Sequence, residues 1–147
     1  MENVAKYATS ESRDFYEMSD DSYLPNDPSA FNTDLSVIYS MEIIPGKEND
    51  FYAGIKKIKE MFKKNNSKGY YAVQSRVFGK GSQVMVVVPL EKGWASLEAN
   101  PDEAWPKMFK KAFPGEDYQA WSKKFDASQK SFNSFVVKWR KDLSSPM

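Results

Sequence analysis

The sequence predicts an α+β domain whose elements follow the order β-α-β-β-α-β. The first observation is the apolar run 35–44, which ends at Pro45-Gly46 and leads into a segment with apolar residues at helical spacing. The second is a pair of strand-like runs, 70–78 and 83–90, separated by a glycine-rich turn. The third is a further helical region that leads into the alternating segment 132–141. Helices connected in this way would cover one face of a four-stranded antiparallel sheet.

The first strand is predicted to be mostly buried on both faces, because apolar side chains alternate along both sides of it. Ser40 and Glu42 form a polar break in this pattern. The following helix begins near Lys47, and Glu48 and Asp50 suit the positive end of its dipole. Its apolar face is formed by residues three or four apart, namely Phe51, Ile55, Ile58 and Phe62.

The second half of the chain contains the hairpin, the second helical region and the closing strand. Gly79-Lys80-Gly81-Ser82 is typical of a hairpin turn between the second and third strands. Asn100-Pro101 predicts a helix start, since asparagine caps helices and proline suits their first turn. This helix breaks at Pro114-Gly115, and a second helical stretch covers about 116–130. Residues 132–141 alternate in character and form the closing strand.

The charge distribution divides the chain into an N-terminal arm, residues 1–34, and a domain, residues 35–147. The arm holds eight acidic and two basic residues, whereas the domain holds twelve acidic and nineteen basic residues. We predict that the arm is partly irregular, with a short helix near residues 3–17. Two arrangements remain open, a flexible arm or an arm that lies over the basic domain, and salt would screen the attraction in the second.

The chain has neither cysteine nor histidine. This excludes disulfides, thiolate nucleophiles, Cys/His zinc sites, His-ligated haem and imidazole bases. Asp20-Asp21 and the segment 25–28 lack the spacing and the closing glutamate of an EF-hand, so we expect no metal site and no cofactor. Any catalysis would depend on Asp, Glu, Lys, Tyr or Ser side chains or on a bound cofactor.

The composition also bears on partners and location. No apolar run approaches the ~18 residues that a membrane helix requires, so we expect a soluble protein without a membrane partner. The lysines between residues 56 and 64 fall on the outer face of the predicted helix, where solvated charge is common, so nucleic acid is not expected as a partner. The start of the sequence lacks the features of a signal peptide, which favours the cytoplasm. A periplasmic or secreted location would follow if a signal peptide had been removed.

The best candidate site is a set of polar side chains at alternate positions of three strands. Glu42 lies on the first strand, Gln74 and Arg76 share a face of the second, and Arg140 lies on the closing strand. If these faces coincide, the four side chains converge and the carboxylate stays ionised between guanidinium groups. The set would form either an ion-pair network at a dimer interface or a pocket for an anionic ligand, unless the register differs by one residue.

Tryptophan residues form a second candidate. Trp94 follows a glycine beside a polar loop and is expected at the rim of a pocket, where aromatic side chains commonly contact small ligands. Trp121 and Trp139 fit core packing better, because they continue the apolar spacing of their own elements.

Four segments together carry a likeness to a known group of proteins. They are the strand leading into Pro45-Gly46-Lys47-Glu48, the helix with Phe51, Ile55 and Ile58, the Gly79-Lys80-Gly81 hairpin, and the closing strand with Asp142-Leu143-Ser144. Over roughly residues 35–145 the chain resembles the dimeric α/β-barrel superfamily of ferredoxin-like domains. That group includes antibiotic-biosynthesis-type monooxygenases, NIPSNAP-like proteins and many uncharacterised bacterial proteins. The resemblance implies a homodimer in which two four-stranded sheets pack face to face, with a small-molecule cavity in each subunit.

These observations lead to three hypotheses about function. The first is binding of a small anionic or aromatic molecule in the barrel cavity, without catalysis. The second follows from cofactor-free oxygenases in the same superfamily, and is a monooxygenase or isomerase in which Tyr39, Arg76 and Trp94 handle the substrate. The third is a non-catalytic interaction protein whose acidic arm docks onto a partner.

Overall fold

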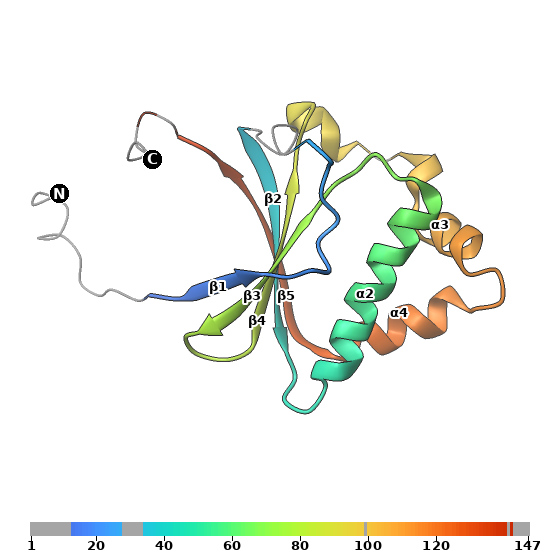
Figure 1. Cartoon of the computed structure of the whole chain (residues 1–147), viewed down its shortest axis with the longest axis horizontal. Coiled ribbons are helices and arrows are strands. Elements are labelled where there is room, and N and C mark those ends of the chain that lie inside the picture. The colour runs from blue at the N-terminus through green and yellow to red at the C-terminus, as the bar shows by residue number, and fades with distance from the viewer. Residues whose placement is uncertain (1–12, 28–33, 99, 141, 143–147) are drawn as a thin grey trace, which may run out of the picture.

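The computed structural model describes residues 13–27, 34–98, 100–140 and 142, which form an α+β fold (Figure 1). In this part of the chain, five strands form one antiparallel sheet, and three α-helices lie on one of its faces. The α+β class predicted from the sequence is confirmed, with one strand more than expected. No helix in the described ranges is long and apolar enough to span a membrane.

The sheet joins strands from both halves of the chain. Its strands are β1 Phe15–Met18, β2 Leu35–Ile43, β3 Ala72–Phe78, β4 Gln83–Pro89 and β5 Gln129–Lys138. Their order is β1-β3-β4-β2-β5, and all neighbours pair antiparallel. The predicted turn of residues 79–82 does connect β3 to β4. Gly79 and Gly81 have φ angles of 136° and 80° there, which glycine adopts without steric strain.

Three helices lie on the covered face, which we term the helix face, and two short turns lie between β4 and the second helix along the chain. They are α2 Glu48–Asn65, α3 Trp105–Ala112 and α4 Tyr118–Asp126, with the 3₁₀ turns η2 Gly93–Leu97 and η3 Pro101–Glu103. α2 ends where Asn66 takes a left-handed conformation with φ of 49°. α4 begins after Asp117, whose carboxylate accepts a hydrogen bond from the backbone N–H of Gln119 at 2.8 Å.

The main core lies between α2 and the sheet. Phe51 and Ile55 of α2 are buried and belong to one cluster with Ile43, Val73 and Val84 of the strands. These two helix positions are part of the apolar face that the sequence predicts. Burial of this face against three strands therefore accounts for the helical spacing of its residues.

The other helices attach to α2. A second apolar cluster joins Met61 of α2 to Met108 and Phe109 of α3. α4 approaches α2 at Gly54, where an added Cβ atom would overlap the ring of Phe125. The lack of a side chain at this position therefore allows close contact between the two helices.

The opposite face of the sheet, which we term the open face, carries none of the helices (Figure 1). On this face Ile38 of β2 lies between Val87 of β4 and Phe135 of β5. Phe135 and Val137 are 48% and 36% exposed. In β2, the predicted first strand, Val37, Met41 and Ile43 on the helix face are buried. Ser36, Ile38 and Glu42 on the open face are only partly buried, so the burial of this strand is less even than predicted.

The N-terminal helix predicted near residues 3–17 is wrong where the structure describes it. Residues Phe15–Met18 form β1, which pairs with the outer edge of β3, and Tyr23 adds an isolated bridge to Tyr71. The free edge of β3 satisfies the backbone groups of β1, and a local sequence pattern does not report such a long-range partner. Residues 3–12 of that prediction lie outside the described residues.

The connection between α4 and β5 lies earlier in the chain than predicted. α4 ends at Asp126 instead of residue 130, and β5 begins at Gln129 instead of residue 132. Ser128 is fully buried between them, and its hydroxyl donates a hydrogen bond to the carbonyl of Phe125 at 2.5 Å. This tight turn ends the helix earlier than its apolar spacing indicates. Residue 141, the end of the predicted strand, lies outside the described residues.

Candidate functional site

A groove with a volume of ≈ 860 Å³ lies between the helix face of the sheet and the three helices. Its floor comes from the strands and its walls come from α2, α3 and α4. The floor includes Tyr39, Val86, Val88 and Phe132, and the walls include Trp105 and Trp121. Tyr39 of β2 is only partly buried, although Val37 and Met41 on the same face of this strand are buried.

Aromatic side chains stack in pairs on both sides of the groove. Tyr39 of β2 stacks with Phe132 of β5, with 5.7 Å between ring centroids. Trp105 of α3 stacks with Trp121 of α4, with 6.5 Å between centroids. Phe132 and Trp105 are 59% and 41% exposed although they line a hollow. The groove therefore presents flat apolar surfaces to any molecule that enters it.

Two polar atoms of groove-lining residues are buried without a hydrogen-bond partner among the described residues. They are the hydroxyl of Tyr71 and the indole nitrogen Nε1 of Trp121. Burial, with a further contribution from the charge of Asp21, raises the pKa of Tyr71 above its usual value, so its hydroxyl stays protonated. Sequence reasoning missed both atoms, because Trp121 fits the apolar spacing of a helix and Tyr71 that of a strand.

The charged side chains of the groove already have partners. Glu103 accepts a hydrogen bond from the hydroxyl of Ser67 at 3.0 Å. Lys130 forms an ion pair with Glu42 at 3.1 Å between Nζ and Oε1. These contacts leave the groove mostly apolar, with a few polar groups in its lining.

Four of the residues singled out from the sequence lie on different surfaces. Tyr39 lines the groove on the helix face, whereas Gln74 faces the other way, opposite Met85 on the open face. Arg76 shares the open face with Gln74, so one small molecule cannot contact both Tyr39 and Arg76. Trp94 lies on η2, outside the groove lining, and is 64% exposed.

Arg76 holds the N-terminal strand against the sheet. Its Nε lies 3.4 Å from a carboxylate oxygen of Asp14, and its Nη2 donates to the hydroxyl of Tyr16 at 3.1 Å. A second bond from Nη2 reaches Gln83, whose amide nitrogen donates to Ser40 at 2.5 Å. The side chain of Arg76 is only 12% exposed. The partner predicted for this arginine was Glu42, and the sequence did not single out Asp14, Tyr16 or Gln83.

The other two members of the predicted polar set have separate partners. Glu42 pairs with Lys130, as described above. Arg140 pairs with Asp142, donating from Nε to Oδ1 at 2.8 Å. This contact raises the pKa of Arg140 and lowers that of Asp142. The contacts of Glu42, Arg76 and Arg140 thus differ from a carboxylate held between two guanidinium groups.

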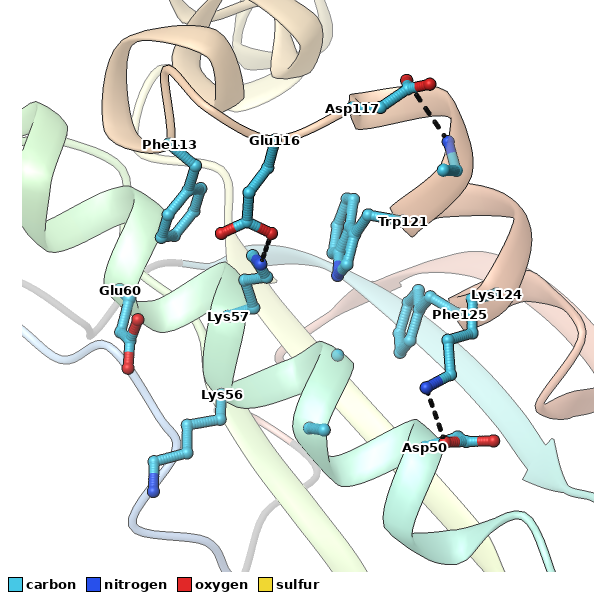
Figure 2. A pocket seen from close by; sticks show the side chains of 13 residues that line it. Asp50, Lys56, Lys57, Glu60, Phe113, Glu116, Asp117, Trp121, Lys124 and Phe125 are labelled. Carbon is cyan, nitrogen blue, oxygen red and sulfur yellow. Dashed lines mark hydrogen bonds and ion pairs between the residues drawn. The ribbon is translucent and has the colours of Figure 1, made fainter.

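A second hollow, with a volume of ≈ 660 Å³, lies between α2 and α4. Figure 2 shows Lys57 of α2 directed at Glu116, and Lys124 of α4 directed at Asp50. Lys124 lies 3.1 Å from Asp50 and lowers the pKa of that carboxyl. Because these charges pair across the cleft, their contacts join α2 to α4 and to the turn before α4, and they leave little for a ligand to bind.

The described residues contain no group of three acidic side chains arranged to hold a metal ion. Comparisons of the chain with protein-family models, with curated proteins and with solved structures gave no match. The functional argument therefore rests on the groove and on the contacts around it.

Proposed function

We propose that the protein binds a small, planar, largely apolar molecule in the groove between the sheet and the helices. The observation that carries this proposal is the pair of exposed aromatic side chains, Phe132 and Trp105, on opposite sides of a hollow of ≈ 860 Å³. Ligand sites in proteins are typically apolar and aromatic clefts of about 300–1,000 Å³ with few polar groups. The groove agrees with this description in size and in lining.

The test is equilibrium dialysis of the full-length protein with 2-acetylnaphthalene, a planar probe. Phe132→Ala removes the exposed ring from the groove floor and should weaken binding about 3- to 10-fold, since an aromatic contact contributes about 0.5–1.5 kcal/mol beyond its buried area. Phe135→Ala is the matched control, because Phe135 is on the same strand, is similarly exposed and lies on the open face. Absence of binding, or equal weakening by both variants, would contradict the proposal.

We further propose that the sheet and helices are a ferredoxin-like unit with β1 added at its edge, and that two copies associate through their open faces. The order β3-β4-β2-β5 and the placement of all helices on one face support the first statement. The exposed apolar groups of the open face, Phe135 and Val137 among them, support the second.

Light scattering after gel filtration would test the association. Phe135→Lys places a charge on the open face and should give a monomer, whereas Phe132→Lys, on the helix face, should keep the wild-type mass. A monomeric wild-type protein would contradict the proposal. The monooxygenase or isomerase hypothesis stays a prediction, and of its three residues the groove contains Tyr39.

A further inference from the structure

The two unpartnered polar atoms of the groove wall indicate what its ligand must offer. Tyr71 is only 5% exposed, and neither its hydroxyl nor the Nε1 of Trp121 has a hydrogen-bond partner among the described residues. About nine in ten buried polar groups in folded proteins are paired, because burying an unpaired one is unfavourable. Both residues line the groove, and Trp121 lines the second hollow as well. The two donor atoms are covered in the empty groove, so a bound molecule supplies the missing partner by displacing the side chains that cover them.

Both atoms act as hydrogen-bond donors. An indole N–H can only donate, and it has no acceptor role. The hydroxyl of Tyr71 stays neutral at physiological pH, because burial raises its pKa, and it therefore keeps a proton to donate. The complementary group on a ligand is an acceptor oxygen.

The charges around the groove select between kinds of acceptor. The acidic side chains Glu103 and Asp126 line the groove, and the charge of Asp21 acts on Tyr71. The basic side chain in the lining, Lys130, is paired with Glu42. These negative charges would repel a carboxylate on the ligand, but they would not repel a neutral carbonyl oxygen.

We infer that the ligand is a neutral, planar aromatic molecule whose carbonyl-type oxygen accepts hydrogen bonds from Tyr71 and Trp121. This inference rests on the proposed function of the groove and adds the chemical class of the ligand. It replaces the anionic ligand that the polar sheet residues suggested. The stacked aromatic pairs hold the flat body of the ligand, and the two donors orient its polar end.

The experiment compares three probes that share one ring system, by equilibrium dialysis with the full-length protein. They are 2-acetylnaphthalene with a carbonyl group, 2-ethylnaphthalene without an acceptor, and 2-naphthoate with a negative charge. We expect the ketone to bind at least fivefold more tightly than either of the others. This preference is opposite to simple partitioning into an apolar cavity, which favours the hydrocarbon.

Variants then assign the preference to the two donors. Tyr71→Phe should lower the affinity for the ketone at least threefold and leave that for the hydrocarbon unchanged. Trp121→Phe also reduces the aromatic wall of the groove, so it should weaken binding of both probes, and binding of the ketone at least threefold more than that of the hydrocarbon. Tyr52→Phe is the matched control, because the hydroxyl of Tyr52 already donates to Ser75 and lies outside the groove lining. Thermal unfolding of each variant shows whether it remains folded.

The outcomes separate this inference from the proposed function. Equal binding of all three probes, weakened by Phe132→Ala, would overturn the inference and leave the groove as a binding site. Tighter binding of 2-naphthoate, or a ketone preference that neither donor variant changes, would also overturn it. If no probe binds, both the inference and the proposed function are wrong.

Discussion

Replacing Tyr71 with phenylalanine should make the ligand-free protein more stable. The ring of Tyr71 packs in the core and meets the ring of Phe62 edge-on, with 5.2 Å between centroids. Tyr71→Phe keeps this ring and removes only the hydroxyl, which is buried without a hydrogen-bond partner among the described residues. The variant therefore relieves the cost of an unpaired polar group and loses few contacts.

The size of the effect follows from the cost of burying an unpaired hydroxyl, which is about 1–3 kcal/mol in protein mutational data. Removing the oxygen leaves a small gap that offsets part of the gain, so we expect the free energy of unfolding to rise by about 1 kcal/mol. For a chain of this length that corresponds to a Tm higher by about 2–4 °C. Urea unfolding followed by circular dichroism, at neutral pH and without ligand, measures the change.

Tyr52→Phe is the control for this measurement, because its hydroxyl donates to Ser75 at 3.3 Å. Removing a paired hydroxyl should lower the free energy of unfolding by about 0.5–1.5 kcal/mol. A loss of stability in Tyr71→Phe similar to that in Tyr52→Phe would refute the reasoning. It would mean that the Tyr71 hydroxyl has a partner in the free protein, and the inferred ligand contact would lose its basis.

Three further predictions concern other contacts. Gly54→Ala should lower the free energy of unfolding by about 1–3 kcal/mol, because its Cβ would overlap Phe125, and thermal unfolding measures this. Asp117→Ala should cost about 1 kcal/mol in urea unfolding through loss of the α4 cap. Above about pH 10 the unfolded chain releases the Tyr71 proton, whereas the folded protein keeps it because burial raises the pKa of Tyr71. The free energy of unfolding of the wild type should therefore fall more steeply with rising pH than that of Tyr71→Phe.

Each of these has a matched control. Gly115→Ala should be neutral or slightly stabilising, because a Cβ there meets open space. Asp126→Ala, at the opposite end of α4, should not destabilise, since an acidic group is unfavourable at a helix C-terminus. Equal effects of the two glycine variants, or of the two aspartate variants, would contradict the packing and capping arguments. If the free energy of unfolding of wild type and of Tyr71→Phe depends on alkaline pH in the same way, the third prediction is contradicted.

The parts of the fold that depend on local pattern could be predicted from the sequence. Apolar spacing and turn residues indicated β2, α2 and the β3–β4 hairpin, because these elements carry their own burial pattern and stop signals. β1 could not be predicted in this way, because Phe15 and Met18 are exposed and its pairing depends on β3, far along the chain. The ion pair that holds β1 in place, between Arg76 and Asp14, also joins residues far apart in the sequence, which a local pattern does not indicate.

The candidate site was predicted less well than the fold, for a physical reason. Alternation along a strand correctly places Gln74 and Arg76 on one face, but it does not tell which face the helices cover. Tyr39 and Arg76 were therefore assigned to one site, although they lie on opposite faces of the sheet. The groove arises from the positions of α3 and α4 relative to the sheet, and Gly54 contributes to those positions by bringing α4 close to α2. Unpaired groups such as the Trp121 nitrogen become visible only after that packing is known.

The two edges of the sheet are unequal, and this limits how copies of the chain can join. In the described part of the chain, β1 covers the outer edge of β3, while the outer edge of β5 has no neighbouring strand. Two copies that pair through their free β5 edges leave no further free edge, so edge-to-edge association stops at a dimer. Loss of residues 1–18 would free the β3 edge as well, next to the exposed Val77 and Phe78. Such a chain could add neighbours in both directions, so proteolysis before residue 19 would turn a self-limiting contact into open-ended fibre growth.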